Sequence, residues 1–178
     1  AGVRTPFMRV GGALAKRDAL ELSVPVIRAM TALAAPDLAV WGAVAPNLTW
    51  SNLAREAMLE AGADPTIPAY SVVMACATSM VGAFAAAGML DGRDRNLALV
   101  GGAESMSRIQ IGLTPGFSDD LRAIVEARTM TARLAAIGAW KHFGLYIPQI
   151  KNRSTGKSMG EHTEEMAKAW KVSRAEQD

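Results

Sequence analysis

The single cysteine of this chain, Cys76, is its strongest candidate for chemistry. It lies in the segment YSVVMACATSM, where a β-like apolar run meets a run of small residues typical of a helix. A thiol at a helix N-terminus lies near amide donors and the positive end of the helix dipole, and both stabilise a thiolate. The sequence therefore predicts a nucleophile at Cys76, against the alternative that a cysteine is often a small buried apolar residue.

Two histidines, His142 and His162, could in principle act as a general base. His162 lies in the polar opening of an expected helix, where a solvated side chain is the ordinary explanation, and His142 lies in an irregular aromatic stretch. Neither histidine is assigned a catalytic role. One cysteine can form neither an internal disulfide nor a structural zinc site, and no metal site is expected.

Two short glycine-containing motifs match nucleotide-binding sites poorly. The TGKS segment at 155–158 ends like a P-loop, but Lys151 stands where the P-loop spacing requires a glycine, and no β-run precedes it. The pair Gly101-Gly102 lacks the third glycine of a dinucleotide fingerprint and is expected to form a tight turn after a strand. Neither motif predicts a nucleotide site.

The elements that must position Cys76 alternate between helix and strand, a pattern that indicates an α/β layer architecture. The first helix is expected to begin at Asp18 or at Ser23, because Pro25 is tolerated only near a helix start. The expected order is a helix over 18–35, a strand over 38–44, a helix over 53–61 between Asn52 and Gly62, a strand over 70–75, a helix over 78–90 and a strand over 97–100.

The chain changes in character after Ser107. Ser118, followed by two aspartates, predicts a helix that continues to Gly138. Residues 121–157 contain seven Lys or Arg and one acidic residue, a local balance of +6 that should attract anions. At the end of the chain, Ser173 and Glu176 have capping-box spacing and predict the start of a helix. No apolar run follows them, so the chain is expected to be incomplete.

The composition excludes several classes of protein. The net charge of +2 and the lack of an aromatic-interleaved basic stripe argue against nucleic-acid binding. The first residues lack the apolar core of a secretion signal, and no run reaches the roughly 18 apolar residues that a membrane-spanning helix needs. The sequence is therefore expected to be that of a soluble protein.

Several motifs in a fixed order identify a family. They are VRTPF at 3–7, NLAR at 52–55, the cysteine segment, GGAESMS at 101–107, MG at 159–160 and SRAEQD at 173–178. Together they resemble the N-terminal part of the thiolase family. The resemblance implies a layered α/β/α fold, with the nucleophile-bearing core half at 1–107, an incomplete inserted loop domain at 108–178, and no C-terminal half.

The resemblance also implies a reaction. A thiolase transfers an acyl group between a 3-ketoacyl-CoA and CoA and releases acetyl-CoA, or runs the reverse Claisen condensation. Cys76 would carry the acyl group, its backbone amide would contribute to an oxyanion site, and Met159 would contact the substrate. Coenzyme A would be a substrate, with no permanently bound cofactor. The family's acid–base groups, in GHP-type and C-x-G motifs, do not occur in this sequence, so these residues alone are expected to be inactive.

The segment ARTMTARL at 127–134 is most similar to the degradative branch of the family, which forms multienzyme complexes of fatty-acid oxidation. The resemblance implies a homodimer or homotetramer in the cytoplasm, or in mitochondria of a eukaryote. The basic segment at 121–157 would bind CoA phosphates, a partner subunit or an anionic membrane surface, or would contribute to solubility alone. Three aromatic residues within it, Trp140, Phe143 and Tyr146, would be interfacial residues or a small core.

Two other functions remain open from the sequence. The CATS segment at 76–79 also occurs at the nucleophile of 3-ketoacyl-acyl-carrier-protein synthases, which have a similar fold. A non-catalytic CoA-binding or lipid-binding module that keeps the thiolase fold is the second alternative.

Overall fold

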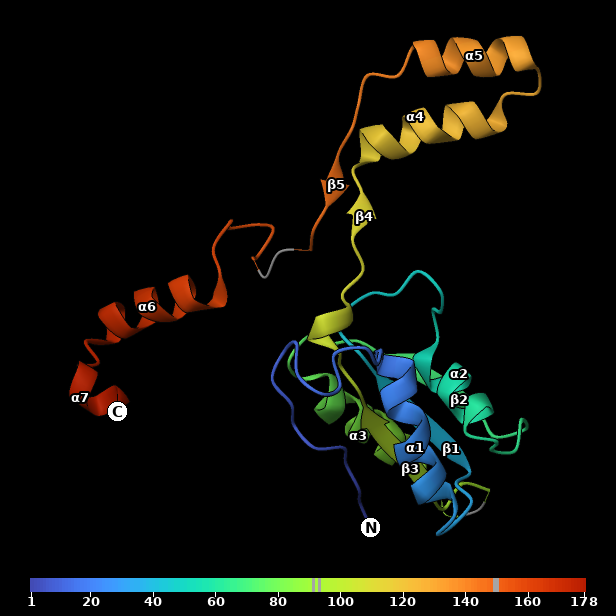
Figure 1. Ribbon diagram of the computed structural model, residues 1–178. Coiled ribbons are helices and arrows are strands. Elements are labelled where there is room, and N and C mark those ends of the chain that lie inside the picture. The colour runs from blue at the N-terminus through green and yellow to red at the C-terminus, as the bar shows by residue number, and fades with distance from the viewer. Residues whose placement is uncertain (91, 93, 149–150) are drawn as a thin grey trace. The chain divides into compact units, whose positions relative to one another are not determined.

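The computed structural model describes residues 1–90, 92, 94–148 and 151–178. Two compact units make up the chain: unit 1 is Ala1–Gln110 and unit 2 is Ile111–Asp178. Unit 1 contains a parallel sheet flanked by helices, and unit 2 contains a helical hairpin and two further helices (Figure 1). The assignment of 1–107 to a thiolase core half and 108–178 to a loop domain stays a prediction.

The sheet of unit 1 has three parallel strands, β1 (Leu38–Gly42), β2 (Ala69–Val72) and β3 (Ala98–Gly102), in the order β2-β1-β3. Every residue of the central strand β1 is buried. Parallel neighbours need crossover connections, and α2 (Leu53–Glu60) and α3 (Thr78–Met89) provide them. All three strands therefore end at the same edge of the sheet.

Helices cover both faces of this sheet. Helix α1 (Ala19–Thr31) and α2 pack with Ala39 and Trp41 on one face, while Leu38 and Val40 face Ala86 of α3 on the other (Figure 1). Successive side chains of a strand point to opposite faces, so the continuous apolar run of β1 supplies both cores. The predicted α/β/α layering is confirmed.

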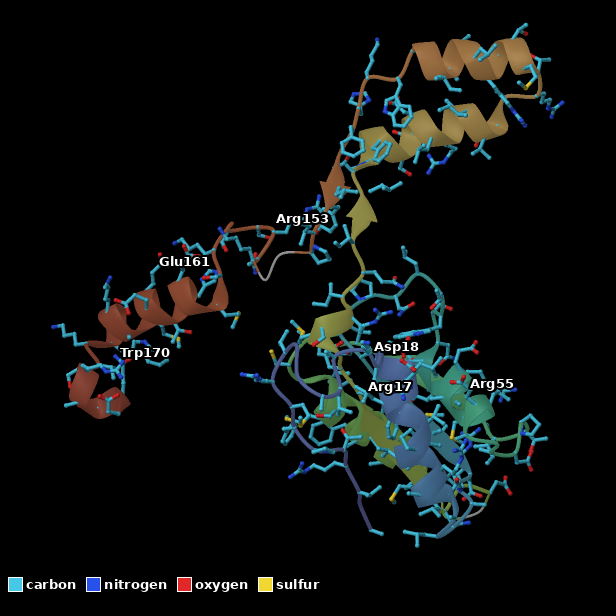
Figure 2. The ribbon with its side chains drawn as sticks, in the orientation of Figure 1. Arg17, Asp18, Arg55, Arg153, Glu161 and Trp170 are labelled. Atoms are coloured by element: carbon cyan, nitrogen blue, oxygen red, sulfur yellow. The ribbon has the colours of Figure 1, made fainter. Side chains whose placement is uncertain are left out.

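The structure decides between the two predicted starts of α1, Asp18 and Ser23. Asp18 is the N-cap, its side chain accepts a hydrogen bond from the Glu21 backbone N–H, and Glu21 completes a capping box. Figure 2 labels Asp18 beside Arg17 at this end of the helix. The helix therefore begins at the earlier position, and Pro25 lies inside it.

The predicted turn at Gly101-Gly102 is wrong. Both glycines are the last residues of β3, where they pair with Trp41 and Gly42 of β1. A Cβ atom at Gly101 would lie 2.3 Å from Cζ3 of Trp41, and one at Gly102 would lie 2.5 Å from the Gly42 carbonyl oxygen. The two glycines therefore allow close packing within a strand, which the local sequence does not distinguish from a turn.

Unit 2 begins with β4 (Gly112–Leu113), which pairs antiparallel with β5 (Leu145–Tyr146). Between them lie two helices, α4 (Pro115–Glu126) and α5 (Met130–Gly138), so the prediction of one helix over 118–138 is wrong. Thr129 starts a second helix, because its side chain accepts a hydrogen bond from Ala132 N–H and caps α5.

An aromatic cluster closes the α4–α5 hairpin. Phe117, which is 7% exposed, lies with its ring centroid 5.4 Å from that of Trp140 and 5.0 Å from that of Phe143. Aromatic rings at such spacing stabilise each other beyond the area they bury. Only Phe117 of this cluster is buried, while Trp140 is 41% and Phe143 81% exposed. The interfacial or core role of Trp140 and Phe143 stays a prediction.

Two capped helices end unit 2. Helix α6 (Met159–Trp170) begins with a capping box of Ser158 and Glu161, and Figure 2 labels Glu161 and Trp170 near its two ends. Helix α7 (Arg174–Gln177) begins with the capping box of Ser173 and Glu176, which confirms the predicted start. Among the residues that the structure describes, none of the helices is long and apolar enough to cross a membrane.

Candidate active site

Cys76 lies on the turn that connects β2 to α3, and its side chain is exposed. The residue before it, Ala75, has φ of 44°, in the left-handed region that residues with a Cβ rarely adopt. Such strained backbone commonly occurs at functional sites, where the surrounding structure enforces it. The turn thus presents Cys76 to solvent two residues before Thr78, the first residue of α3.

Thr78 holds this turn in place. Its buried hydroxyl accepts a hydrogen bond from Met74 N–H at 2.8 Å and donates one to the Ala75 carbonyl at 2.7 Å. A Cβ atom at Gly42, the last residue of β1, would lie 2.4 Å from Cγ2 of Thr78. The glycine therefore lets the start of α3 approach the sheet, and the threonine joins both sides of the cysteine turn.

An open depression of about 350 Å³ adjoins Cys76 at the carboxyl edge of the sheet. Its lining residues are 42–44 after β1, 75–76 and 78–79 on the cysteine turn, and 101–104 at the end of β3. Ligands of parallel α/β sheets bind outside the carboxyl ends of the strands. This volume lies at the lower end of the range for small-molecule sites.

The GGAESMS segment at 101–107 braces this edge. Oε2 of Glu104 accepts hydrogen bonds from the backbone N–H groups of Val44 at 2.7 Å and Ala45 at 3.1 Å. Ser105 donates a hydrogen bond to the Arg17 carbonyl at 2.6 Å. The motif therefore ties the end of β3 to the loop after β1 and to the segment that precedes α1.

Both histidines of the chain lie in unit 2. Nδ1 of His142 is 3.1 Å from Oδ2 of Asp120, and Nε2 of His162 is 2.8 Å from Oγ1 of Thr155. Hydrogen bonds from the backbone N–H groups of His142 and Lys141, followed by the His142 side chain, lower the pKa of Asp120. Unit 1 therefore supplies no imidazole to Cys76, and the prediction that neither histidine is catalytic stays a prediction.

Met159, the predicted substrate contact, is the first residue of α6 and is 65% exposed. It belongs to unit 2 and Cys76 belongs to unit 1, so the structure places each within its own unit. Its substrate role stays a prediction. Among the described parts of the chain, no group of three or more His, Cys, Asp or Glu side chains could hold a metal ion.

A cysteine on a strand-to-helix turn at the carboxyl edge of a parallel sheet defines an α/β protein with a candidate nucleophile. The structure is similar to the crystal structure of the Bacillus anthracis acetyl-CoA acetyltransferase, with a TM-score of 0.76 and 22% sequence identity, over 97% of this chain and 41% of that one. At this identity the likeness shows the fold.

Sequence comparison identifies the family. The family model described as "Thiolase, N-terminal domain" matches residues 1–178. The 3-ketoacyl-CoA thiolase of Vibrio cholerae serotype O1 is 34% identical over 185 residues, and that of Shewanella oneidensis is 32% identical over 188 residues. This chain belongs to the thiolase family, which confirms the resemblance. The alignments cover 100% of this chain and 42% of each relative, so the chain spans about two fifths of their length.

Proposed function

We propose that this chain is the nucleophile-bearing part of a thiolase that transfers an acyl group between a 3-ketoacyl-CoA and CoA. The observation that carries the proposal is the exposed Cys76 on a strained strand-to-helix turn beside an open depression. The names of the relatives, 3-ketoacyl-CoA thiolases, support this substrate class. Coenzyme A is then a substrate, and the reaction requires no permanently bound cofactor.

The reaction has two covalent steps. The Cys76 thiolate attacks the 3-keto carbon, the bond between C2 and C3 breaks, and the departing acetyl-CoA carbanion takes up a proton. The thiol of a second CoA then loses its proton and attacks the acyl thioester on Cys76, which releases acyl-CoA and restores the thiolate. The backbone amide of Cys76 is the proposed oxyanion donor, and Met159 is the proposed substrate contact. The reverse sequence is the Claisen condensation.

The proton transfers need an acid and a base close to Cys76. Unit 1 contains no histidine and no second cysteine. We assign these groups to a part of the enzyme outside residues 1–178, and the 178 residues alone should therefore be inactive. A reducing compartment keeps a thiol nucleophile in its active form, and we propose a location in the cytoplasm, or in mitochondria of a eukaryote.

The decisive variant is Cys76→Ser in the full-length polypeptide that carries these residues. Incubation with a 3-ketoacyl-CoA should add the mass of the acyl group to the wild-type peptide containing Cys76, and the variant should show neither adduct nor turnover. A Cys76→Ala variant serves as a control for weak attack by the serine hydroxyl. Turnover retained in both variants would place the nucleophile elsewhere, and an absence of adduct with bound CoA would favour the non-catalytic module.

The proposed partners are a second copy of the chain and, for the α4–α5 hairpin, a multienzyme subunit or an anionic membrane surface. Met130, Leu134 and Ile137 lie one helical turn apart on α5 and are 67%, 62% and 50% exposed. Amphipathic helices with cations beside such a stripe bind membrane interfaces. Arg133 on the same helix, with Arg128 two residues before its start, would supply the cations that attract anionic lipid.

Liposome co-sedimentation tests the membrane proposal. The double variant Leu134→Ser and Ile137→Ser should abolish binding that depends on anionic lipid, and it leaves the aromatic cluster of the hairpin intact. The matched control, Thr131→Ser on the same helix, should bind like the wild-type protein. If the wild-type protein fails to sediment with anionic vesicles at low salt, the membrane proposal is wrong, and CoA attraction or solubility remains as the role of the charge.

A further inference from the structure

The loop after β1, residues 43–49, is fixed from outside by two side chains that follow β3. Glu104 accepts hydrogen bonds from the N–H groups of Val44 and Ala45, at 2.7 and 3.1 Å. Oε1 of Gln110 accepts one from Leu48 N–H at 2.6 Å, and its amide nitrogen lies 3.3 Å from Oδ1 of Asn47. We call residues 43–49 the rim loop.

The rim loop is also braced from within. Oδ1 of Asn47 accepts hydrogen bonds from the backbone N–H of Thr49 at 2.8 Å and from its hydroxyl at 2.6 Å. The loop nevertheless leaves two apolar side chains in solvent, Val44 at 48% exposure and Leu48 at 83%. Ordering a loop costs conformational entropy that these exposed side chains do not offset by burial. The hydrogen bonds therefore hold the loop in a shape that its own packing does not explain.

Val44 and Glu104 both line the depression beside Cys76. The two hydrogen bonds that Glu104 accepts fix consecutive amides, so they set the position of the backbone that carries the Val44 side chain. A reacting group must approach within about 3.5 Å of its partner in one orientation, and a wall that moves by about 1 Å changes the rate strongly. The geometry makes the rim loop one wall of the approach to the thiol.

We propose that Glu104 is a positioning residue that holds Val44 as an apolar wall and thereby limits the bulk of the group that reaches Cys76. The identity of that group as an acyl thioester rests on the proposed function, whereas the control of access to the thiol does not. Glu104 acts through the two amides, so an uncharged side chain with an oxygen in the same place should serve nearly as well.

The test compares two thiol reagents on the full-length polypeptide, because labelling of Cys76 needs no turnover. Rates of modification by small iodoacetamide and bulky fluorescein maleimide are read on the peptide containing Cys76 by mass spectrometry. Glu104→Ala should raise the ratio of the bulky to the small rate by about fivefold, the factor that corresponds to one net hydrogen bond. Glu104→Gln, which keeps an acceptor oxygen, and Glu60→Ala, an exposed glutamate at the end of α2, should leave the ratio within about twofold.

Three results would overturn the proposal: an unchanged ratio in Glu104→Ala, equal acceleration of both reagents, or a Gln variant as disruptive as the Ala variant. If Glu104→Ala does not fold, hydrogen exchange of the wild-type protein decides. Slow exchange at the amides of Val44 and Ala45 supports the proposed hydrogen bonds to Glu104, and exchange at the rate of free peptide refutes them. A changed ratio in a protein that forms no acyl adduct on Cys76 would reject the proposed function and retain the role of Glu104.

Discussion

The Thr78 hydroxyl shapes the turn that carries Cys76, a role that the place of Thr78 in the CATS segment does not reveal. It joins Met74 N–H to the Ala75 carbonyl, one before and one on the left-handed residue Ala75 that precedes Cys76. Both hydrogen bonds are part-buried, so their loss costs more than the loss of fully exposed ones. A hydroxyl group beside the cysteine turn therefore helps to determine where the thiol lies.

Replacement of this hydroxyl by a methyl group, Thr78→Val, should destabilise the full-length protein by about 1–3 kcal/mol, because Met74 N–H and the Ala75 carbonyl both lose a part-buried hydrogen bond. Acylation of Cys76 should slow as well, since the turn no longer has one enforced conformation. Denaturant unfolding and adduct formation measure the two effects. The control Thr31→Val removes a hydroxyl that donates to the Ile27 and Arg28 carbonyls of its own helix, α1, and should change stability by less than about 0.5 kcal/mol. Equal effects of the two variants would contradict the special role of Thr78.

A carboxylate at each end of the β1–β3 pair accepts hydrogen bonds from backbone N–H groups that lie beyond the strands. At the amino end, Oδ2 of Asp37 accepts from the N–H groups of Asn96 and Leu97, at 2.8 and 2.9 Å. At the carboxyl end, Glu104 does the same for the rim loop. The central strand is thus held in register by side chains in addition to its own ladder, which keeps the carboxyl edge beside Cys76 in a fixed geometry.

Asp37 makes this end of the sheet sensitive to acid. The hydrogen bonds from Asn96 N–H and then Leu97 N–H lower its pKa in the folded state. Its contribution to stability is therefore complete above the unfolded pKa, which is about 3.9, and is lost as the pH falls through the lower folded value. The Asp37→Asn variant should be less stable at pH 7, and its free energy of unfolding should depend less on pH below about 4. Urea unfolding between pH 3 and 7 measures this; a variant with the wild-type acid slope would contradict it.

Much apolar surface of unit 1 remains exposed. Helix α3 is apolar on all sides but buries only the side that faces the sheet, which leaves Met80 at 60% and Phe84 at 72% exposure. Val73 and Met74, which precede the cysteine turn, are 64% and 55% exposed. Within the described residues, β2 and β3 each pair with β1 alone. Parallel sheets are normally covered on both faces and protected at their edges.

The isolated 178 residues should therefore fold poorly by themselves, because the exposed side of α3 and the open strand edges favour association over a compact monomer. Circular dichroism during heating should give a broad transition, and size exclusion should show self-association. The full-length polypeptide under the same conditions is the control and should melt cooperatively. A sharp transition of a monomeric 178-residue chain would show that the exposed surface does not limit folding.

The sequence by itself determined the features that depend on neighbouring residues. Asn52 and Gly62 bound α2, and the pair Ser173 and Glu176 begins α7, because a helix cap needs partners only three or four positions away. The strand-to-helix junction at Cys76 could be predicted for the same reason. The family could also be predicted, because the motifs that identify it are short local segments in a fixed order.

Tertiary structure decided what depends on residues far apart in the chain. The local sequence predicts a turn at Gly101. In the structure the Trp41 side chain, sixty positions earlier in the chain, occupies the space that a Cβ of residue 101 would need. The sequence assigns no role to Glu104 within its motif. Only the structure shows that its carboxylate accepts hydrogen bonds from the amides of Val44 and Ala45. Pairing of parallel strands brings such residues together across long crossovers, and no local pattern records which partners will meet. The sequence thus points to Cys76 as the candidate nucleophile, whereas the walls around it follow from the fold.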